Sequence, residues 1–236
     1  MSSIATYQNF GEVTLLLEQA GCQYLVLRNF DELLSDEVFM AGHADIDLLC
    51  RNASEVAKAI SAKPSNPGKA DGVHYCINIK GKKASLDLRQ VGDGYYCTAW
   101  QEDMLNSRIP YKGFYIMDRT NLFYSLVYHA ILQKSTLSAE YRRRLTDMAR
   151  ELGLTVDENA AEQSLLAYLE AFMAKNGYTY TYCTDKHVPL RRAAGINRRM
   201  IKKDAGLRLR HFAYDAKLAV IDFLVRVKHL GRKSQG

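Results

Sequence analysis

The chain has 236 residues, of which 47% are hydrophobic and 25% charged, as in an ordinary globular protein with one large domain or two smaller ones. No apolar run approaches the ~18 residues of a membrane-spanning helix, and the first residues lack the basic and apolar regions of a signal peptide. Five scattered cysteines without metal-ligand spacing argue against a disulfide framework and against a zinc site. We therefore expect a reduced, cytoplasmic protein.

The net charge of +6 is divided unevenly along the chain. Residues 186–236 carry 14 Lys or Arg and 3 Asp, a balance of +11, so the first 185 residues carry −5. A basic C-terminal region indicates an anionic partner, such as nucleic acid, nucleotide phosphates or an anionic membrane surface.

The first half of the chain mixes helical and strand patterns. In chain order we expect a helix over 10–20 that ends at Gly21, a strand over 24–27, a loop or short helix over 30–40, a strand over 45–50, a helix over 53–62 capped by Asn52, a loop over 63–69, a hairpin of strands 73–79 and 83–88, a helix over 98–107 and a strand over 111–117.

From residue 121 the apolar spacing becomes mainly helical, with Asp118 or Thr120 as the cap. We expect helices over 121–132, 140–152 and 157–176, an extended segment over 178–188, a basic segment over 189–203 and a final helix over 205–230. The predicted fold class is α+β: a mixed sheet with flanking helices, followed by a mainly helical half. The predicted domains are an α/β domain over 1–118 and a helical domain with a basic C-terminal segment over 119–236.

The strand over 45–50 contains two aspartates two residues apart. Because side chains alternate along a strand, Asp45, Asp47 and the preceding His43 share one face, and the apolar residues between them occupy the other. Carboxylates that face the same way repel each other unless a cation lies between them. Asp87 has a similar apolar setting in a later strand, so the three indicate a two-magnesium phosphoryl-transfer site. Alternatively, these aspartates lie at strand ends or on a solvent-facing surface.

The order of these strands resembles the nucleotidyltransferase fold of the polymerase-β type, over roughly residues 10–118. More narrowly, four segments resemble bacterial nucleotidyltransferase-like proteins encoded with surface-polysaccharide genes: residues 24–29 (YLVLRN), 43–49 (HADIDLL), 86–89 (LDLR) and 128–134 (YHAILQK).

The resemblance implies transfer of a nucleotidyl or phosphoryl-type group from a nucleoside triphosphate or nucleotide-activated donor to a hydroxyl of a small or glycan acceptor in cell-envelope polysaccharide synthesis. Asp45 and Asp47 would hold Mg²⁺, with Mn²⁺ as a substitute, and Asp87 would complete a second metal site and help to deprotonate the acceptor. The nucleotide-binding residues implied are Arg28, Asn29, Arg89 and Lys134.

The sequence departs from the superfamily after its first strand, where Gly-Ser is usual and Arg28-Asn29 stands instead. Arg28 can bind phosphate through two parallel hydrogen bonds, or it can pair with the acidic loop that follows. Arg89 can be a substrate clamp or a counter-charge for Asp87, and Lys134 can bind nucleotide or complement a helix dipole. Two other functions stay open: a non-catalytic nucleotide- or partner-binding module, and an RNA-directed nucleotidyltransferase.

Three basic pairs lie at 191–192, 198–199 and 202–203, and the helix predicted after them is amphipathic. Such a helix can dock peripherally on the anionic inner face of a membrane, or it can be a core helix with a solvated charged face. Nucleic acid is the less expected partner, because no aromatic residues are interleaved with the pairs. Alternating Tyr178, Tyr180 and Tyr182 can stack on a base or pack in the core.

Overall fold

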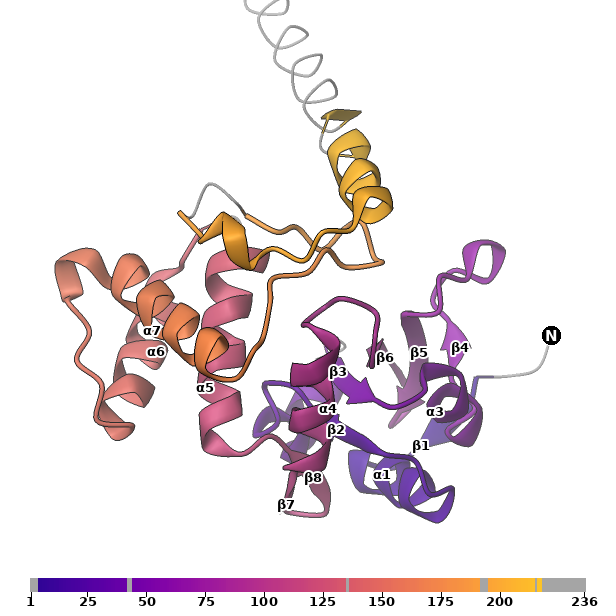
Figure 1. Cartoon of the computed structure of the whole chain (residues 1–236). Helices are drawn as coiled ribbons and strands as arrows, with labels where there is room; N and C mark the ends of the chain where they lie inside the picture. The colour runs from indigo at the N-terminus through magenta and orange to yellow at the C-terminus, as the bar shows by residue number, and fades with distance from the viewer. Residues whose placement is uncertain (1–3, 42–43, 135, 192–194, 215, 218–236) are drawn as a thin grey trace, which may run out of the picture.

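The computed structural model describes residues 4–41, 44–134, 136–191, 195–214 and 216–217, and it contains a mixed sheet with helices on both faces (Figure 1). The strands run in the order β1-β5-β6-β3-β2-β8-β7, and β4 pairs with β5. Their bounds are β1 (Thr6–Tyr7), β2 (Tyr24–Val26), β3 (Asp45–Cys50), β4 (Lys63–Pro64), β5 (His74–Ile79), β6 (Lys82–Gln90), β7 (Ile109–Tyr111) and β8 (Phe114–Ile116).

The α-helices mostly begin at side chains that accept hydrogen bonds from the free N–H groups of the first turn. Asn9, Asn52 and Asp118 cap α1, α3 and α5 in this way, which confirms Asn52 and selects Asp118 over Thr120. The bounds are α1 (Phe10–Gln19), α2 (Asp36–Met40), α3 (Ala53–Ala59), α4 (Thr98–Asn106), α5 (Arg119–Tyr128), α6 (Ala139–Glu151) and α7 (Ala161–Lys175), with a π-helical turn η3 (His129–Gln133) directly after α5.

The central strands place the predicted acidic positions side by side. β3 is antiparallel to β2 and parallel to β6, and β6 forms the predicted hairpin with β5. The hairpin turn is Lys80-Gly81, and both residues have positive φ, as a two-residue turn of type I′ requires. The strand that carries two aspartates therefore neighbours the strand that carries the third, as predicted.

The two faces of the sheet pack into different hydrophobic clusters. Ile46, Leu48 and Leu86 belong to the cluster that includes α1 and α3, whereas Leu25, Leu27 and Leu49 belong to the one that includes α4, α5, α6 and α7. Because side chains alternate, Asp45 and Asp47 lie on the same face as Leu49. The predicted site residues thus share the sheet face that the helical part of the chain covers.

Two predictions of local structure were wrong, one of a strand and one of a loop. The strand expected over 111–117 is a hairpin of β7 and β8, because Lys112 and Gly113 both adopt positive φ and reverse the chain. The loop expected over 63–69 begins with β4, in which Lys63 pairs with Cys76 and Pro64 with Tyr75. A proline is acceptable there because β4 has a strand on one side only.

Residues 119–175 are mainly helical, and 205–214 are helical again. The rest of the final helix predicted to residue 230, apart from 216–217, lies outside the described residues. The hydrophobic cluster around Trp100 draws on both sides of the boundary predicted at 118/119, so that boundary stays a prediction. All five cysteines are free, and no helix within the described ranges is long and apolar enough to cross a bilayer.

Candidate functional site

Two of the predicted catalytic carboxylates lie opposite each other near the middle of the sheet. In the parallel pairing of β3 with β6, Asp47 is the register partner of Asp87, and Asp45 is the partner of Ser85. Asp47 is 4% exposed, whereas Asp45 lies at the exposed start of β3. Strand alternation puts the three aspartates on one face of the sheet.

The three aspartates repel one another. Partial burial raises the pKa of Asp45, and the negative charges of Asp47 and Asp87 raise it further. Burial also raises the pKa of Asp87, against the opposing effect of Arg89. Because both pKa values are raised, simultaneous ionisation of Asp45, Asp47 and Asp87 is unfavourable unless a further cation is present.

Arg28 neutralises part of this acidic face. Its guanidinium Nη2 lies 2.9 Å from Asp47 Oδ1, and its Nη1 donates a 3.0 Å hydrogen bond to the hydroxyl of Tyr95. The pair is nearly dry, with side-chain exposures of 12% for Arg28 and 6% for Asp47. The ionic partner of Arg28 is thus a predicted metal ligand and not the acidic loop that the sequence offered as an alternative.

Asn29 forms the turn after β2 in a left-handed conformation, with φ of +55°. Glycine adopts this conformation most easily, and asparagine is among the few other residues that tolerate it. Asn29 can therefore provide the backbone turn for which a glycine would otherwise be needed. Its backbone oxygen accepts a hydrogen bond from the amide of Glu32.

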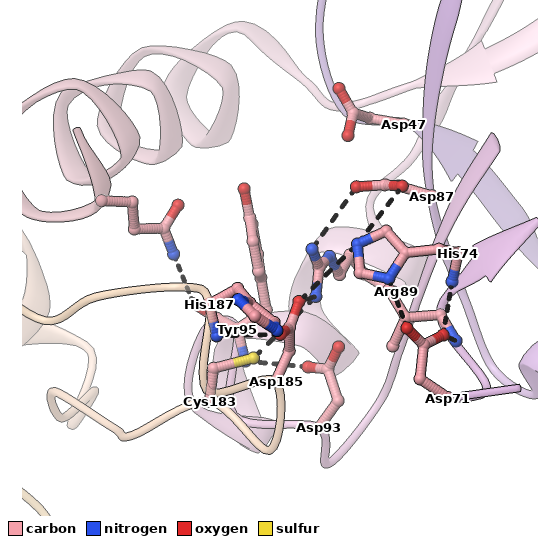
Figure 2. Close-up of polar contacts among 12 residues, drawn as sticks. Asp47, Asp71, His74, Asp87, Arg89, Asp93, Tyr95, Cys183, Asp185 and His187 are labelled. Carbon is pink, nitrogen blue, oxygen red and sulfur yellow. Dashed lines mark hydrogen bonds and ion pairs between the residues drawn. The ribbon is translucent and has the colours of Figure 1, made fainter. Parts of the chain in front are cut away.

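Arg89 is the second buried cation of the site, and Figure 2 shows it between the carboxylates of Asp87 and Asp185. Its charged partners are these two carboxylates: it donates a 3.1 Å hydrogen bond to Asp185 and a longer one, of 3.4 Å, to Asp87. Its guanidinium carbon also lies 4.6 Å from the ring centroid of Tyr95. The remaining nitrogen, Nε, is buried without any hydrogen-bond partner. An unsatisfied donor of this kind in a charged site can receive an oxygen of a ligand.

Asp185 comes from the extended segment after α7, which crosses above the sheet (Figure 1). The backbone N–H of Thr184 donates to the carbonyl of Asp93 at 2.7 Å, next to Gly94. A Cβ on Gly94, which has φ of +75°, would collide with the carbonyl oxygen of Tyr182. This glycine therefore permits the close approach that carries Asp185 to Arg89.

His74 and Asp71 form a pair at the open side of the site (Figure 2). His74 Nδ1 lies 2.6 Å from Asp71 Oδ2, while its Nε2 faces Asp87 at 3.8 Å and Asp185 at 3.9 Å. Burial alone would raise the pKa of Asp71, but hydrogen bonds from His74 and Val73 lower it to about 2. The pKa of His74 is raised, because burial, which would lower it, is outweighed by its acidic neighbours.

The helical part of the chain closes the other side of the site. The hydroxyl of Tyr95 lies 3.2 Å from Nδ1 of His129, which begins the π-helical turn and lies 3.0 Å from Gln133 Oε1. Burial, followed by the positive charge of Arg28, lowers the pKa of His129 to about 3, so this imidazole is neutral. Lys134 follows, close enough for its charge to lower the pKa values of both His129 and Asp45.

The structure brings most of the predicted site residues to one place. Arg28, Arg89 and Lys134 all act on the three aspartates, through hydrogen bonds or through charge. His43, expected on the same face, lies outside the described residues. Asn29 is beside the site, and the structure assigns its side chain no polar contact there.

Four further residues of the site were not predicted: Asp71, His74, Tyr95 and Asp185. His129 lies in the segment 128–134 that carries the resemblance, but it was not assigned a role there. Asp185 has no local signal, because it reaches the sheet only through the path of the segment after α7. Asp71 falls between the loop predicted over 63–69 and the strand predicted over 73–79, although an aspartate three residues before a histidine at the start of a strand could have drawn attention. The π-helical turn that positions His129 was also not predicted.

The alternating tyrosines are core residues and not a base-stacking surface. Tyr178, Tyr180 and Tyr182 are all at least 92% buried, with exposures of 6%, 0% and 6%. Tyr178 stacks on Trp100 with ring centroids 5.4 Å apart and an interplanar angle of 12°. Aromatic packing, the commoner of the two expected explanations, accounts for them.

Comparison of the chain with protein-family models, with curated proteins and with solved structures found no match in any of the three. What the site does must therefore follow from its own geometry and chemistry.

Proposed function

We propose that this chain is a metal-dependent transferase of the nucleotidyltransferase type. It would move a nucleotidyl or phosphoryl-type group from a nucleoside triphosphate or nucleotide-activated donor to a hydroxyl of a small or glycan acceptor. The observation that carries the proposal is the pairing of Asp47 with Asp87 on adjacent parallel strands, with Asp45 on the same face. The link to cell-envelope polysaccharide synthesis depends on the sequence resemblance alone.

The carboxylates fit Mg²⁺ or Mn²⁺ in chemistry. Hard cations of this kind prefer carboxylate oxygens. The pKa values of Asp45 and Asp87 are raised by burial and, in addition, by neighbouring carboxylates, and a bound cation would oppose both effects. Among the described residues, however, no three His, Cys, Asp or Glu side chains are already gathered round one point. Asp47 and Asp87 would have to turn from Arg28 and Arg89 to become ligands.

The metal would be held by Asp45, Asp47 and Asp87, and when bound it would neutralise and orient the phosphates of the donor. Arg28, released by Asp47, would then be free to bind phosphate oxygens, and Arg89, which keeps its hydrogen bond to Asp185, would offer the nitrogen released by Asp87. Both arginines are nearly dry, and the unpaired Nε of Arg89 already offers one donor. Guanidinium groups suit this task because two parallel N–H groups match two oxygens of a phosphate.

Proton transfer from the acceptor hydroxyl requires a base within hydrogen-bond reach. Asp87 is the base that the resemblance implies, and His74 lies next to it with Nε2 directed toward the site. Asp71 fixes the orientation of the ring through Nδ1. Because the acidic neighbours raise the pKa of His74, its ring favours the protonated form, and its positive charge would favour the ionised form of Asp87 that accepts the proton.

The test is thermal stabilisation by a panel of nucleoside triphosphates and nucleotide sugars, each with and without Mg²⁺. Wild type is compared with Asp45→Asn, because Asp45 is exposed and its loss leaves both arginine pairs intact. The matched control is Glu32→Gln, which removes one exposed carboxylate from the short turn at residues 32–34, away from β3 and β6. Transfer to glycan acceptors is then measured as release of the leaving group, which is pyrophosphate when a nucleotidyl group leaves a nucleoside triphosphate.

A Mg²⁺-dependent shift with one donor, kept in Glu32→Gln and lost in Asp45→Asn, supports the proposal. A ligand at a hundred times its Kd stabilises the native state by about 2.7 kcal/mol, which is readily measured. A panel without any Mg²⁺-dependent shift would count against a metal-dependent transferase.

A second candidate is a non-catalytic module that binds a nucleotide or a protein partner. The observation in its favour is that Asp47 and Asp87 are each already paired with an arginine. For this function we expect ligand stabilisation that is indifferent to Mg²⁺ and to Asp45→Asn, with no pyrophosphate release.

A further inference from the structure

A second charged site lies outside the one described above, where the segment after α7 meets the helical residues 205–214. It is a pocket of about 440 Å³, here called the basic pocket. Five of its lining residues are basic and one is acidic: Arg198, Arg199, Lys202, Lys203, Arg208 and Asp204. The acidic residue is already engaged, because Asp204 Oδ1 accepts a hydrogen bond from the amide of Leu207 at 2.9 Å.

The basic pocket has a large excess of positive over negative charge among its lining residues. Within the part of the chain that the structure describes, none of the five basic side chains forms an ion pair with a carboxylate. Their backbone is nevertheless held in place: Tyr180 N–H donates to Met200 O at 2.9 Å, and Lys202 N–H donates to Tyr180 O at 2.8 Å. Fixed like charges round a cavity favour a multiply charged anion such as a phosphate group.

An exposed apolar pair adjoins the basic pocket. Ala205, Arg208, Leu209 and Phe212 follow the helical spacing of one face and line a second hollow that shares two residues with the basic pocket. Leu209 is 67% exposed and Phe212 is 64% exposed, higher fractions than for any other large hydrophobic residue among those described. Such exposure marks an interaction surface.

The opposite face fixes this helix to the body of the protein. His211 is 5% exposed and its Nε2 donates to the carbonyl of Cys183 at 2.7 Å. The hydroxyl oxygen of Tyr214 lies 2.8 Å from Nδ1 of His187. The helix extends away from the sheet (Figure 1), and Leu209 and Phe212 are exposed on it while His211 holds it to the segment after α7.

We propose that the basic pocket and the apolar pair together form a docking surface for an anionic lipid bilayer. The five cations would bind lipid phosphates at headgroup level, and Leu209 with Phe212 would enter the boundary between headgroups and acyl chains. A bilayer is the partner that presents phosphates and an apolar layer side by side, as this surface requires. A nucleic acid would use the cations but leave Leu209 exposed to water. The inference does not depend on the proposed transferase activity.

The experiment is co-sedimentation of the full chain with vesicles of phosphatidylcholine, with and without phosphatidylglycerol, at low and high salt. One variant is Arg198→Gln with Arg199→Gln, and its charge-matched control is Arg142→Gln with Arg143→Gln on the exposed face of α6. The other variant is Leu209→Ser with Phe212→Ser, and its control is Leu15→Ser, at a residue 53% exposed on α1.

We expect binding to the phosphatidylglycerol vesicles that weakens with salt and falls roughly tenfold or more in each variant, while the controls bind as wild type does. Circular dichroism of each variant confirms that it is folded. The proposal is overturned by absence of binding, or by binding that either variant leaves unchanged. Binding to RNA without binding to vesicles would also overturn it and would assign the basic pocket to nucleic acid.

Discussion

The carboxylate of Asp185 accepts a hydrogen bond of 3.1 Å from the guanidinium of Arg89, although 96 positions separate the two residues in the chain. Both side chains are nearly dry, with exposures of 5% for Arg89 and 7% for Asp185. The contact holds the segment after α7 against β6 and completes the wall of the candidate site. The site is therefore built by both halves of the chain, and its stability and its chemistry should respond to the same residues.

Replacing Asp185 with Asn should destabilise the protein strongly. The change leaves Arg89 buried with only the longer contact to Asp87, and breaking a buried pair costs about 3 kcal/mol or more. Urea unfolding measures the loss. The control is Asp147→Asn, whose partner Arg150 is 71% exposed, and a surface pair of this kind contributes less than about 1 kcal/mol. Equal losses for the two variants would show that the Arg89 contact does not stabilise the fold.

Gly94→Ala should dislodge the segment that carries Asp185. The added Cβ meets the carbonyl oxygen of Tyr182, whereas a Cβ on Gly92, which also has positive φ, meets nothing within 4 Å. Both substitutions lose about 1 kcal/mol for the left-handed backbone, and Gly94→Ala should lose a further ~1–3 kcal/mol for the collision. The difference between the two free energies of unfolding isolates that collision. If Gly92→Ala is as harmful, the close approach at Gly94 is not what matters.

Asp45→Asn should stabilise the protein in the absence of ligand. The raised pKa of Asp45 reflects partial burial and repulsion from Asp47 and Asp87, and both penalties disappear with the charge. We expect a gain of about 0.5 kcal/mol near neutral pH, kept small by the exposure of the side chain. Functional sites commonly lower the free energy of unfolding in this way. A loss of stability at low ionic strength would contradict the repulsion.

The pair of His74 and Asp71 should make stability fall at both ends of the pH range. The pKa of Asp71 is lowered from 3.8 to about 2, so its contribution is present above pH 3.8 and is lost as the pH falls toward 2. The pKa of His74 is raised above 6.5, so its contribution is complete below pH 6.5 and is lost as the pH rises through the raised value. His74→Gln should flatten the alkaline side, as unfolding at a series of pH values will measure.

His129 should have the opposite effect from His74. The pKa of His129 is lowered from 6.5 to about 3, so between these pH values the unfolded chain is protonated at this residue and the folded chain is not. Stability therefore falls as the pH drops from 6.5 toward 3. In His129→Gln this part of the acid sensitivity should disappear, and an NMR titration of the wild-type ring should show no protonation above about pH 4. A ring that titrates near 6.5 would contradict the buried, neutral state.

The local structure was largely readable from the sequence because its causes are local. Asn52 and Asp118 cap helices through their own side chains, and the alternation of Asp45 and Asp47 with apolar neighbours fixes which face they occupy. The failure at 111–117 was local as well, because the positive φ of Lys112 gives no sign in its residue type. The failure at 63–69 had a different cause, because β4 is a strand only through its pairing with β5.

The tertiary structure decided which charged side chains contact each other. The sequence by itself determined that Asp45 and Asp47 would share one face of a strand and that Asp87 would lie in a later strand, next to Arg89. Only the fold placed Arg28 on Asp47, brought His129 to Tyr95 and carried Asp185 across the chain to Arg89. The physical reason is that a buried charge must be neutralised by whatever group packing brings within a few ångströms, and packing is set by the whole chain.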